Sequence, residues 1–145
     1  MKLILQRVVN ASVFVDDDEV SSISKGILVF FCAEKGDGES KVDFLTEKTL
    51  NLRIFSDDRG KMNFSCLDVG GDILVVSQFT LAGDCSHGRR PGFDQAADPA
   101  TARSLYEYYI KLLNRSGLNI GSGKFGRDMK IKLINDGPST FLLER

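Results

Sequence analysis

The chain has 145 residues, a formal net charge of −1 and an apolar fraction of 42%, which is the size and composition of one globular domain. Three cysteines, an odd number, argue against a disulfide scaffold. No apolar run is long enough to span a bilayer, and the first residues lack a signal-peptide pattern, so a cytoplasmic location is expected. The near-zero charge also excludes a global basic field, so a nucleic acid would be bound through a few local contacts.

Alternating apolar and polar residues predict a series of short strands in the first half of the chain. These strands are residues 2–9, 11–15, 19–23, 27–32, 53–55 and 72–79. A helix is predicted over residues 40–51, because apolar side chains recur there at three- and four-residue steps. Turn sequences rich in Asp and Gly separate these elements.

The second predicted helix is the clearest element of the chain. Asp98 is a good N-cap, Pro99 suits the first helical position, and Gly117 is expected to follow the end of the helix. Two further strands, residues 129–135 and 140–143, follow it. Together the elements predict a single α+β domain over residues 1–145, with a mostly antiparallel β-sheet of barrel-like or sandwich-like form and two helices packed against it.

A Gly-Pro pair, Gly137-Pro138, lies between the last two predicted strands. Proline has no N–H to donate to a sheet ladder, so the strand is expected to stop or turn here. Glycine lets backbone groups approach another molecule closely, and an X-Pro bond is where a cis peptide costs least. The pair therefore either presents two rigid carbonyl groups to a ligand or forms an ordinary turn.

A second polar segment, Ser77–Thr80, ends the apolar strand that begins at residue 72. Ser77 and Thr80 carry hydroxyl groups that are possible nucleophiles, but no base stands near them in the sequence, and the only histidine is His87. Backbone N–H groups freed by the end of the ladder are the alternative chemistry, since they can hold a developing oxyanion. A strand end whose hydroxyls cap its own backbone is the competing structural explanation.

Cysteine and histidine spacing does not favour metal chemistry. Cys85 and His87 are close in sequence, but no second pair of ligands stands at zinc spacing. We therefore expect neither a metal nor another cofactor.

The segments described so far strongly resemble the D-aminoacyl-tRNA deacylases, and the resemblance runs from end to end. Each motif is weak alone, but their order and spacing are specific. The motifs are Gln6-Arg7-Val8, Asn51-Leu52-Arg53-Ile54-Phe55, Gly60-Lys61-Met62-Asn63, Asp68-Val69-Gly70-Gly71, Ser77-Gln78-Phe79-Thr80-Leu81, Arg90-Pro91, Phe125-Gly126 with Asp128-Met129, and Asn135-Asp136-Gly137-Pro138.

The resemblance implies hydrolysis of the ester that joins a D-amino acid, or mischarged glycine, to the terminal adenosine of tRNA. It further implies a homodimer in which Gly137-Pro138 of one subunit, in cis form, enters the other subunit's pocket. The Gly-Pro carbonyls would then occupy the space that an L side chain needs. Arg7 matches the family's brace for the Gly-Pro. Rejection by rigid backbone would serve every side chain, because specificity then comes from a clash.

The remaining site residues also follow from the resemblance. Ser77, Gln78, Phe79 and Thr80 match the active-site strand, where the N–H of Phe79 contacts the ester carbonyl. Hydrolysis would use either Thr80 as nucleophile or the 2′-hydroxyl of the terminal ribose, and the lack of a base favours the ribose. Phe125 and Met129 match the family's adenosine pocket. The acceptor end of aminoacyl-tRNA is the implied partner, and we expect its contacts among Arg89, Arg90, Lys124 and Arg127.

Two positions depart from the family pattern. Gly92 stands where a serine or threonine is common, and Ser139 stands where an apolar residue is common. Two other classes of function remain open on the residues alone. One is a small-molecule hydrolase or deaminase that uses Thr80 or Cys85, and the other is a binding module in which the Gly-Pro is only a turn.

Overall fold

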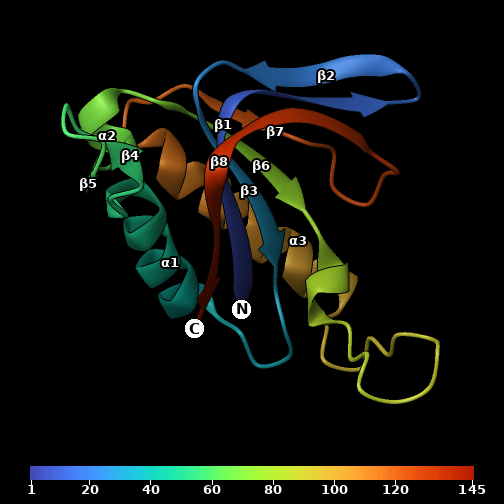
Figure 1. Cartoon of the computed structure of the whole chain (residues 1–145). Coiled ribbons are helices and arrows are strands. Elements are labelled where there is room, and N and C mark those ends of the chain that lie inside the picture. Colours follow the sequence, from blue (N-terminus) through green and yellow to red (C-terminus); the bar gives the residue numbers. More distant parts are fainter.

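The computed structural model describes residues 1–145, and its centre is a six-stranded sheet organised around one long strand (Figure 1). That strand, β1 (Lys2–Val15), pairs antiparallel with β8 (Lys130–Glu144) along one edge. Along its other edge it pairs antiparallel first with β3 (Gly26–Cys32) and then with β2 (Asp18–Ile23). Two parallel pairings then extend the sheet from β3 to β6 (Asp72–Ser77) and to β7 (Ile120–Ser122).

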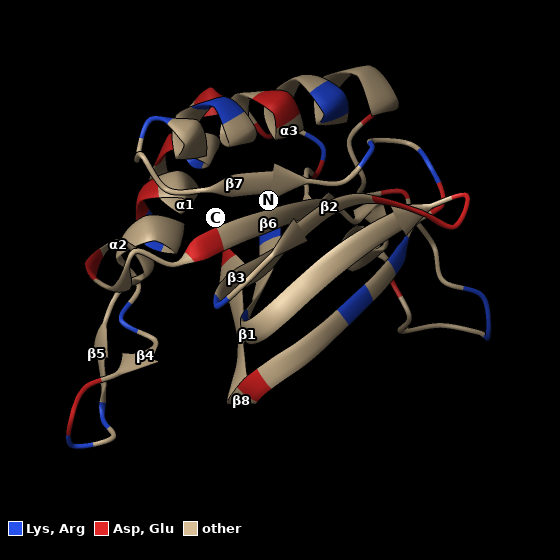
Figure 2. Cartoon of the chain, turned by 90° about the horizontal axis from the view of Figure 1, so that it is seen from above, with Lys and Arg blue, Asp and Glu red and all other residues tan.

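Two helices lie side by side across one face of the sheet (Figures 1 and 2). In α1 (Glu39–Asn51), the buried side chains include Val42 and Leu45. In α3 (Pro99–Asn114), the carboxylate of Asp98 caps the first turn by accepting hydrogen bonds from the next free N–H groups, as expected for an N-cap. The main hydrophobic core fills the space between these helices and the sheet.

The predicted α+β class is confirmed, with a mostly antiparallel sheet and one domain, but several boundaries differ. Residues 2–9 and 11–15 form one continuous strand, because the break expected near residue 10 is only a shift of register against β8. The strand expected over residues 72–79 ends at Ser77, and the 3-10 turn η1 (Phe79–Ala82) follows it. The short strand expected over residues 53–55 lies later, as β4 (Phe55–Ser56). Three short elements were not predicted: α2 (Cys66–Val69), β5 (Met62–Phe64) and β7.

The prediction that the last strand stops at the Gly-Pro is wrong. β8 continues through it, with Thr140 opposite Gln6 and Asn135 opposite Val8, so residues 136–139 together face Arg7 alone. Such a bulge lets a proline sit in a strand because the extra residues make no ladder bonds. The Gly137–Pro138 peptide bond is cis.

No helix of the chain is both long enough and apolar enough to cross a membrane.

Candidate functional site

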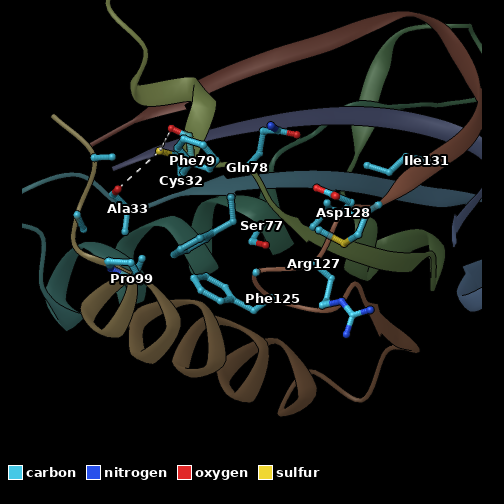
Figure 3. Close-up of a pocket in the computed structure, with 17 residues that line it drawn as sticks. Cys32, Ala33, Ser77, Gln78, Phe79, Pro99, Phe125, Arg127, Asp128 and Ile131 are labelled. Carbon is cyan, nitrogen blue, oxygen red and sulfur yellow. Dashed lines mark hydrogen bonds between the residues drawn. The ribbon is translucent and has the colours of Figure 1, made fainter. Parts of the chain in front are cut away.

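A cavity of about 560 Å³ opens where β6 ends, and five predicted site residues line it: Ser77, Gln78, Phe79, Phe125 and Met129 (Figure 3). The first three come from the end of β6, and the last two come from the segment between β7 and β8. The start of α3 forms a further wall. The fold therefore brings two segments almost fifty residues apart in sequence to one concave site.

The backbone at the end of β6 leaves one N–H group without an acceptor. The N–H of Gln78 donates to the carbonyl of Phe31 at 2.7 Å, and that of Leu81 donates to the carbonyl of Gln78 at 3.2 Å. No acceptor is found for the N–H of Phe79, because β7 has already ended at Ser122 on that side. This donor borders the cavity and is free to bind an oxyanion.

Thr80 is poorly placed to act as a nucleophile. It is exposed, it does not line the cavity, and its hydroxyl accepts a 2.5 Å hydrogen bond from the side-chain amide of Gln78. An amide cannot remove a proton from that hydroxyl. Asp128 supplies the only carboxylate among the lining residues. Neither Ser77 nor Thr80 donates a hydrogen bond to a carboxylate or to His87, so the bonded nucleophile–base pair typical of side-chain nucleophilic catalysis is not formed here.

The opposite wall of the cavity is apolar and well supported. Two residues of α3 contact the ring of Phe125: the ring of Tyr106, at 5.7 Å, and the guanidinium of Arg103, at 5.0 Å. Gly123 makes room for Met129, since a Cβ at Gly123 would lie 2.6 Å from the methionine sulfur. A flat, rigid wall of this kind is suited to a nucleobase, which binds aromatic and apolar surfaces by stacking.

Sequence reasoning missed the small residues at the back of the cavity. Ala33, Ala96, Ala97 and Ala102 contribute to the lining, together with Pro99. Alanine carries no chemical signal of a site, so only the topology reveals this role. Their small size is what leaves the space open between the sheet and α3.

None of the three cysteines is placed as a nucleophile. Cys32 borders the cavity, but its thiol points at the carbonyls of Ala33 and Phe79, each 3.6 Å away, and burial raises its pKa. Cys66 lies in the buried start of α2, and burial raises its pKa to about 12. Cys85 is exposed and outside the cavity. No group of three or more His, Cys, Asp or Glu side chains is arranged to hold a metal.

The Gly-Pro lies outside this cavity and is held by side chains around it. Arg7, which is buried, donates from Nε to the carbonyl of Asp136 at 3.0 Å and pairs with its carboxylate at 3.0 Å. Nη1 of Arg7 also bonds to the carbonyl of Ile54. On the other side, the amide of Asn135 donates to the carbonyl of Ser139 at 3.3 Å. The bulge is therefore bonded on both sides.

The two departures from the family pattern have different environments. The hydroxyl of Ser139 is buried and has no hydrogen-bond partner, an arrangement that costs about 1–3 kcal/mol. Gly92 is exposed, and a Cβ there would meet only the carbonyl of Asp84, at 4.0 Å. The Gly92 position thus has room for a larger side chain.

Strand register separates the Gly-Pro from the cavity of the same chain. Ser77 is aligned across the sheet with Phe31, Leu3 and Leu143, whereas the Gly-Pro bulge faces Arg7. The two sites thus differ by three strand spacings, about 14 Å, and by four residues along the strands, about 13 Å. Ser77, Phe79, Phe125 and Met129 meet in one site, while Arg7, Gly137 and Pro138 form another.

Comparison with known proteins gives a consistent result. The family model described as D-Tyr-tRNA(Tyr) deacylase matches residues 4–144. Proteins named D-aminoacyl-tRNA deacylase are similar over the full length: that of Pelobacter propionicus is 52% identical and covers 100% of both chains, and that of Geotalea daltonii is 54% identical over 99% of this chain and 96% of its own.

Two solved structures share the fold. One, described as a c-Myc DNA unwinding element binding protein, matches with a TM-score of 0.93 at 38% identity, covering 100% of this chain and 99% of its own. The other, described as a probable eukaryotic D-amino acid tRNA deacylase, matches with a TM-score of 0.83 over 98% of this chain and 97% of its own. At 18% identity, the second comparison concerns the fold alone.

Proposed function

The chain belongs to the D-Tyr-tRNA(Tyr) deacylase family, a family of hydrolases, and we propose that it hydrolyses the ester bond of D-aminoacyl-tRNA, releasing the D-amino acid and free tRNA. The observation that carries this proposal is the unbonded N–H of Phe79 at the edge of a cavity whose opposite wall is Phe125 and Met129. We place the ester carbonyl at the N–H of Phe79 and the terminal adenine against Phe125. Both groups belong to the aminoacylated 3′ end of one tRNA, which would span the cavity. The reaction takes place in the cytoplasm, where aminoacyl-tRNA is used.

Hydrolysis proceeds by attack of water on the ester carbonyl. The carbonyl oxygen gains negative charge as the tetrahedral intermediate forms, and the N–H of Phe79 stabilises that charge. The 2′-hydroxyl of the terminal ribose stands next to the ester and orients or activates the water. This role falls to the RNA because the hydroxyl of Thr80 is bonded only to an amide and has no base beside it.

The partner subunit of a homodimer supplies the chiral gate in this proposal. The Gly-Pro of each chain lies too far from its own cavity to contact the same substrate, by about 14 Å across the sheet. Its rigid support by Arg7 suits a backbone that rejects L side chains by contact. A two-fold axis would place each Gly-Pro in the opposite cavity and create two equivalent sites.

Exposed apolar side chains next to the Gly-Pro support such an interface. Val9 is 50% exposed and Ile134 is 55% exposed, and both lie where β1 and β8 pair beside the bulge. Large apolar side chains grouped on a surface are typical of protein contacts. A second copy of this chain would cover them when it receives the Gly-Pro.

A deacylation assay with matched charged tRNAs tests the proposed function. We expect D-tyrosyl-tRNA and glycyl-tRNA to be cleaved and L-tyrosyl-tRNA to stay largely intact, because only an L side chain meets the Gly-Pro. Release of labelled amino acid would be followed over time. Equal cleavage of D- and L-tyrosyl-tRNA would refute the gate, and cleavage of neither would refute the activity.

The role of the RNA can be separated from that of Thr80. A D-aminoacyl-tRNA with a 2′-deoxy terminal adenosine should be hydrolysed far more slowly, whereas Thr80→Ala should keep substantial activity on the natural substrate. Single-turnover rates would be compared for both changes. The reverse ranking, with an acyl group trapped on Thr80, would establish side-chain nucleophilic catalysis instead.

A further inference from the structure

A projecting loop beside the cavity carries two basic side chains that the proposed chemistry does not use. The loop extends away from the layers of the fold in Figure 1. Two backbone hydrogen bonds close it, from Asp84 N to Gly92 O at 2.8 Å and from Gly92 N to Asp84 O at 2.9 Å. We call residues 84–92 the basic arm, since its tip holds Arg89 and Arg90, both exposed.

The cations of the basic arm have no acidic partner. Neither Arg89 nor Arg90 forms an ion pair, and the one acid in the arm, Asp84, accepts a hydrogen bond from the N–H of Ser86 at 2.8 Å. By contrast, Arg127, which was expected to contact tRNA, pairs with Asp16 at 2.6 Å. Figure 2 shows the other Lys and Arg residues distributed over many elements of the fold. Two adjacent unpaired arginines therefore lie at the tip of a loop that begins and ends beside the cavity.

A pair of aromatic rings in contact connects the basic arm to the cavity. The rings of Phe79 and Phe93 meet edge to face with their centroids 5.1 Å apart. Both rings remain accessible, Phe79 at 58% and Phe93 at 37% exposure. Phe79 lines the cavity, and Phe93 directly follows the arm. Exposed aromatic rings followed by unpaired cations are the combination with which proteins bind single-stranded nucleic acid, by base stacking and phosphate contact.

We propose that Phe79, Phe93 and the basic arm form a track for the unpaired nucleotides that precede the terminal adenosine of tRNA. In this track the rings take bases and Arg89 and Arg90 take backbone phosphates. The inference rests on the proposed function, because it assumes that the terminal adenosine occupies the cavity. It adds a second contact region, outside the cavity, that holds RNA without touching the ester.

A double variant, Arg89→Ala with Arg90→Ala, tests the track against two substrates. With D-aminoacyl-tRNA we expect kcat/KM to fall about tenfold through KM, with kcat unchanged, because each arginine removed costs about one phosphate contact. With D-aminoacyl-adenosine, which has no preceding nucleotides, we expect no change. The salt dependence of kcat/KM should also become shallower, by about 0.7 in logarithmic slope per lost contact with a single strand.

A matched control removes the same charge elsewhere. Lys111 and Arg115 are exposed at the far end of α3, whose first turn borders the cavity, and neither forms an ion pair. Lys111→Ala with Arg115→Ala should leave both substrates unaffected. An equal loss of kcat/KM in this control would show that the effect comes from net charge alone and would overturn the track. An equal loss of kcat/KM on both substrates in the arm variant would also overturn it.

Binding of uncharged tRNA gives a readout that does not depend on turnover. Fluorescence anisotropy should show weaker binding for the arm variant and for Phe93→Ala, with recovery in Phe93→Tyr, which restores a stacking ring. Unchanged binding in the arm variant would overturn the proposal. If the wild-type protein bound tRNA through the arm but cleaved no D-aminoacyl-tRNA, the proposed function would fail while the track remained.

Discussion

Replacing Phe79 by proline should lower kcat for D-aminoacyl-tRNA by roughly 10²–10³-fold, the usual cost of losing one oxyanion donor. Proline removes the N–H that we assign to the ester oxygen and leaves the rest of the strand end in place. The matched variant Phe79→Ala keeps that N–H and loses only the ring, so it should raise KM for tRNA and affect kcat much less. Single-turnover rates at saturating enzyme would give the comparison.

The fold should tolerate proline at this position. Phe79 is the first residue of η1, where φ lies near the value that proline fixes. Its N–H makes no hydrogen bond, so no internal bond is lost. Similar melting temperatures for Phe79→Pro and Phe79→Ala would confirm that both are folded. Equal kcat values for the two folded variants would show that the backbone N–H has no part in the reaction.

The parts of the fold that could be predicted were those with strong local patterns. The cap at Asp98 and the proline at 99 locate the start of α3 to the residue, because each signal acts within a few positions. The short pieces β5, β7 and α2 could not be predicted, since their few residues fold there only because longer elements surround them. Local pattern carries no information about such support.

The Gly-Pro illustrates a different limit. Proline and glycine together are a strong stop signal, yet β8 continues past them. The reason lies in the partner strand: β1 pairs with β8 on both sides of the bulge, and Arg7 binds the carbonyl and carboxylate of Asp136. Long-range strand pairing of this kind overrides a local strand-breaking signal. The residues around the proline carry no information about that pairing, because the partner strand lies far away in the sequence.

The candidate site was predictable where chemistry leaves a polar mark and hidden where it does not. The side chains of Ser77–Thr80 were a polar signal, whereas Phe125 and Met129 were assigned only through the family resemblance. The structure places members of both segments around one cavity. The end of a strand indicated free backbone donors in this segment, and the family resemblance assigned that role to Phe79. The alanines of the back wall gave no signal, since their contribution is the volume that they leave unfilled.

A mixed dimer made from two inactive subunits should regain activity if the partner supplies the gate. One subunit carries Phe79→Pro and lacks the oxyanion donor. The other carries Gly137→Ala, whose Cβ would lie 2.1 Å from Oδ1 of Asn135. The Asn135 side chain and the Gly-Pro backbone must then move, and we expect the displaced backbone to obstruct the cavity that receives it. Each homodimer alone should therefore be nearly inactive on D-aminoacyl-tRNA.

In the mixed dimer, the two defects fall in the same cavity. The cavity of the Gly137→Ala subunit has an intact Phe79 and receives the intact Gly-Pro of its partner, so one cavity of the two is complete. Random pairing of equal amounts puts half of the chains in mixed dimers, and activity should return to roughly a quarter of the wild-type value. Coexpression with two different tags, followed by sequential purification, would isolate the mixed species and raise that share to about half.

The control for this experiment is a mixture of the two purified homodimers, assayed before their subunits have had time to exchange. This mixture should stay inactive. Two outcomes contradict the proposal. If isolated mixed dimers are as inactive as their parents, each chain uses its own Gly-Pro and the separation of about 14 Å across the sheet must close by another movement. If the chain sediments as a monomer while it still rejects L-aminoacyl-tRNA, no partner is needed, and selectivity resides within the cavity bounded by Phe79 and Phe125.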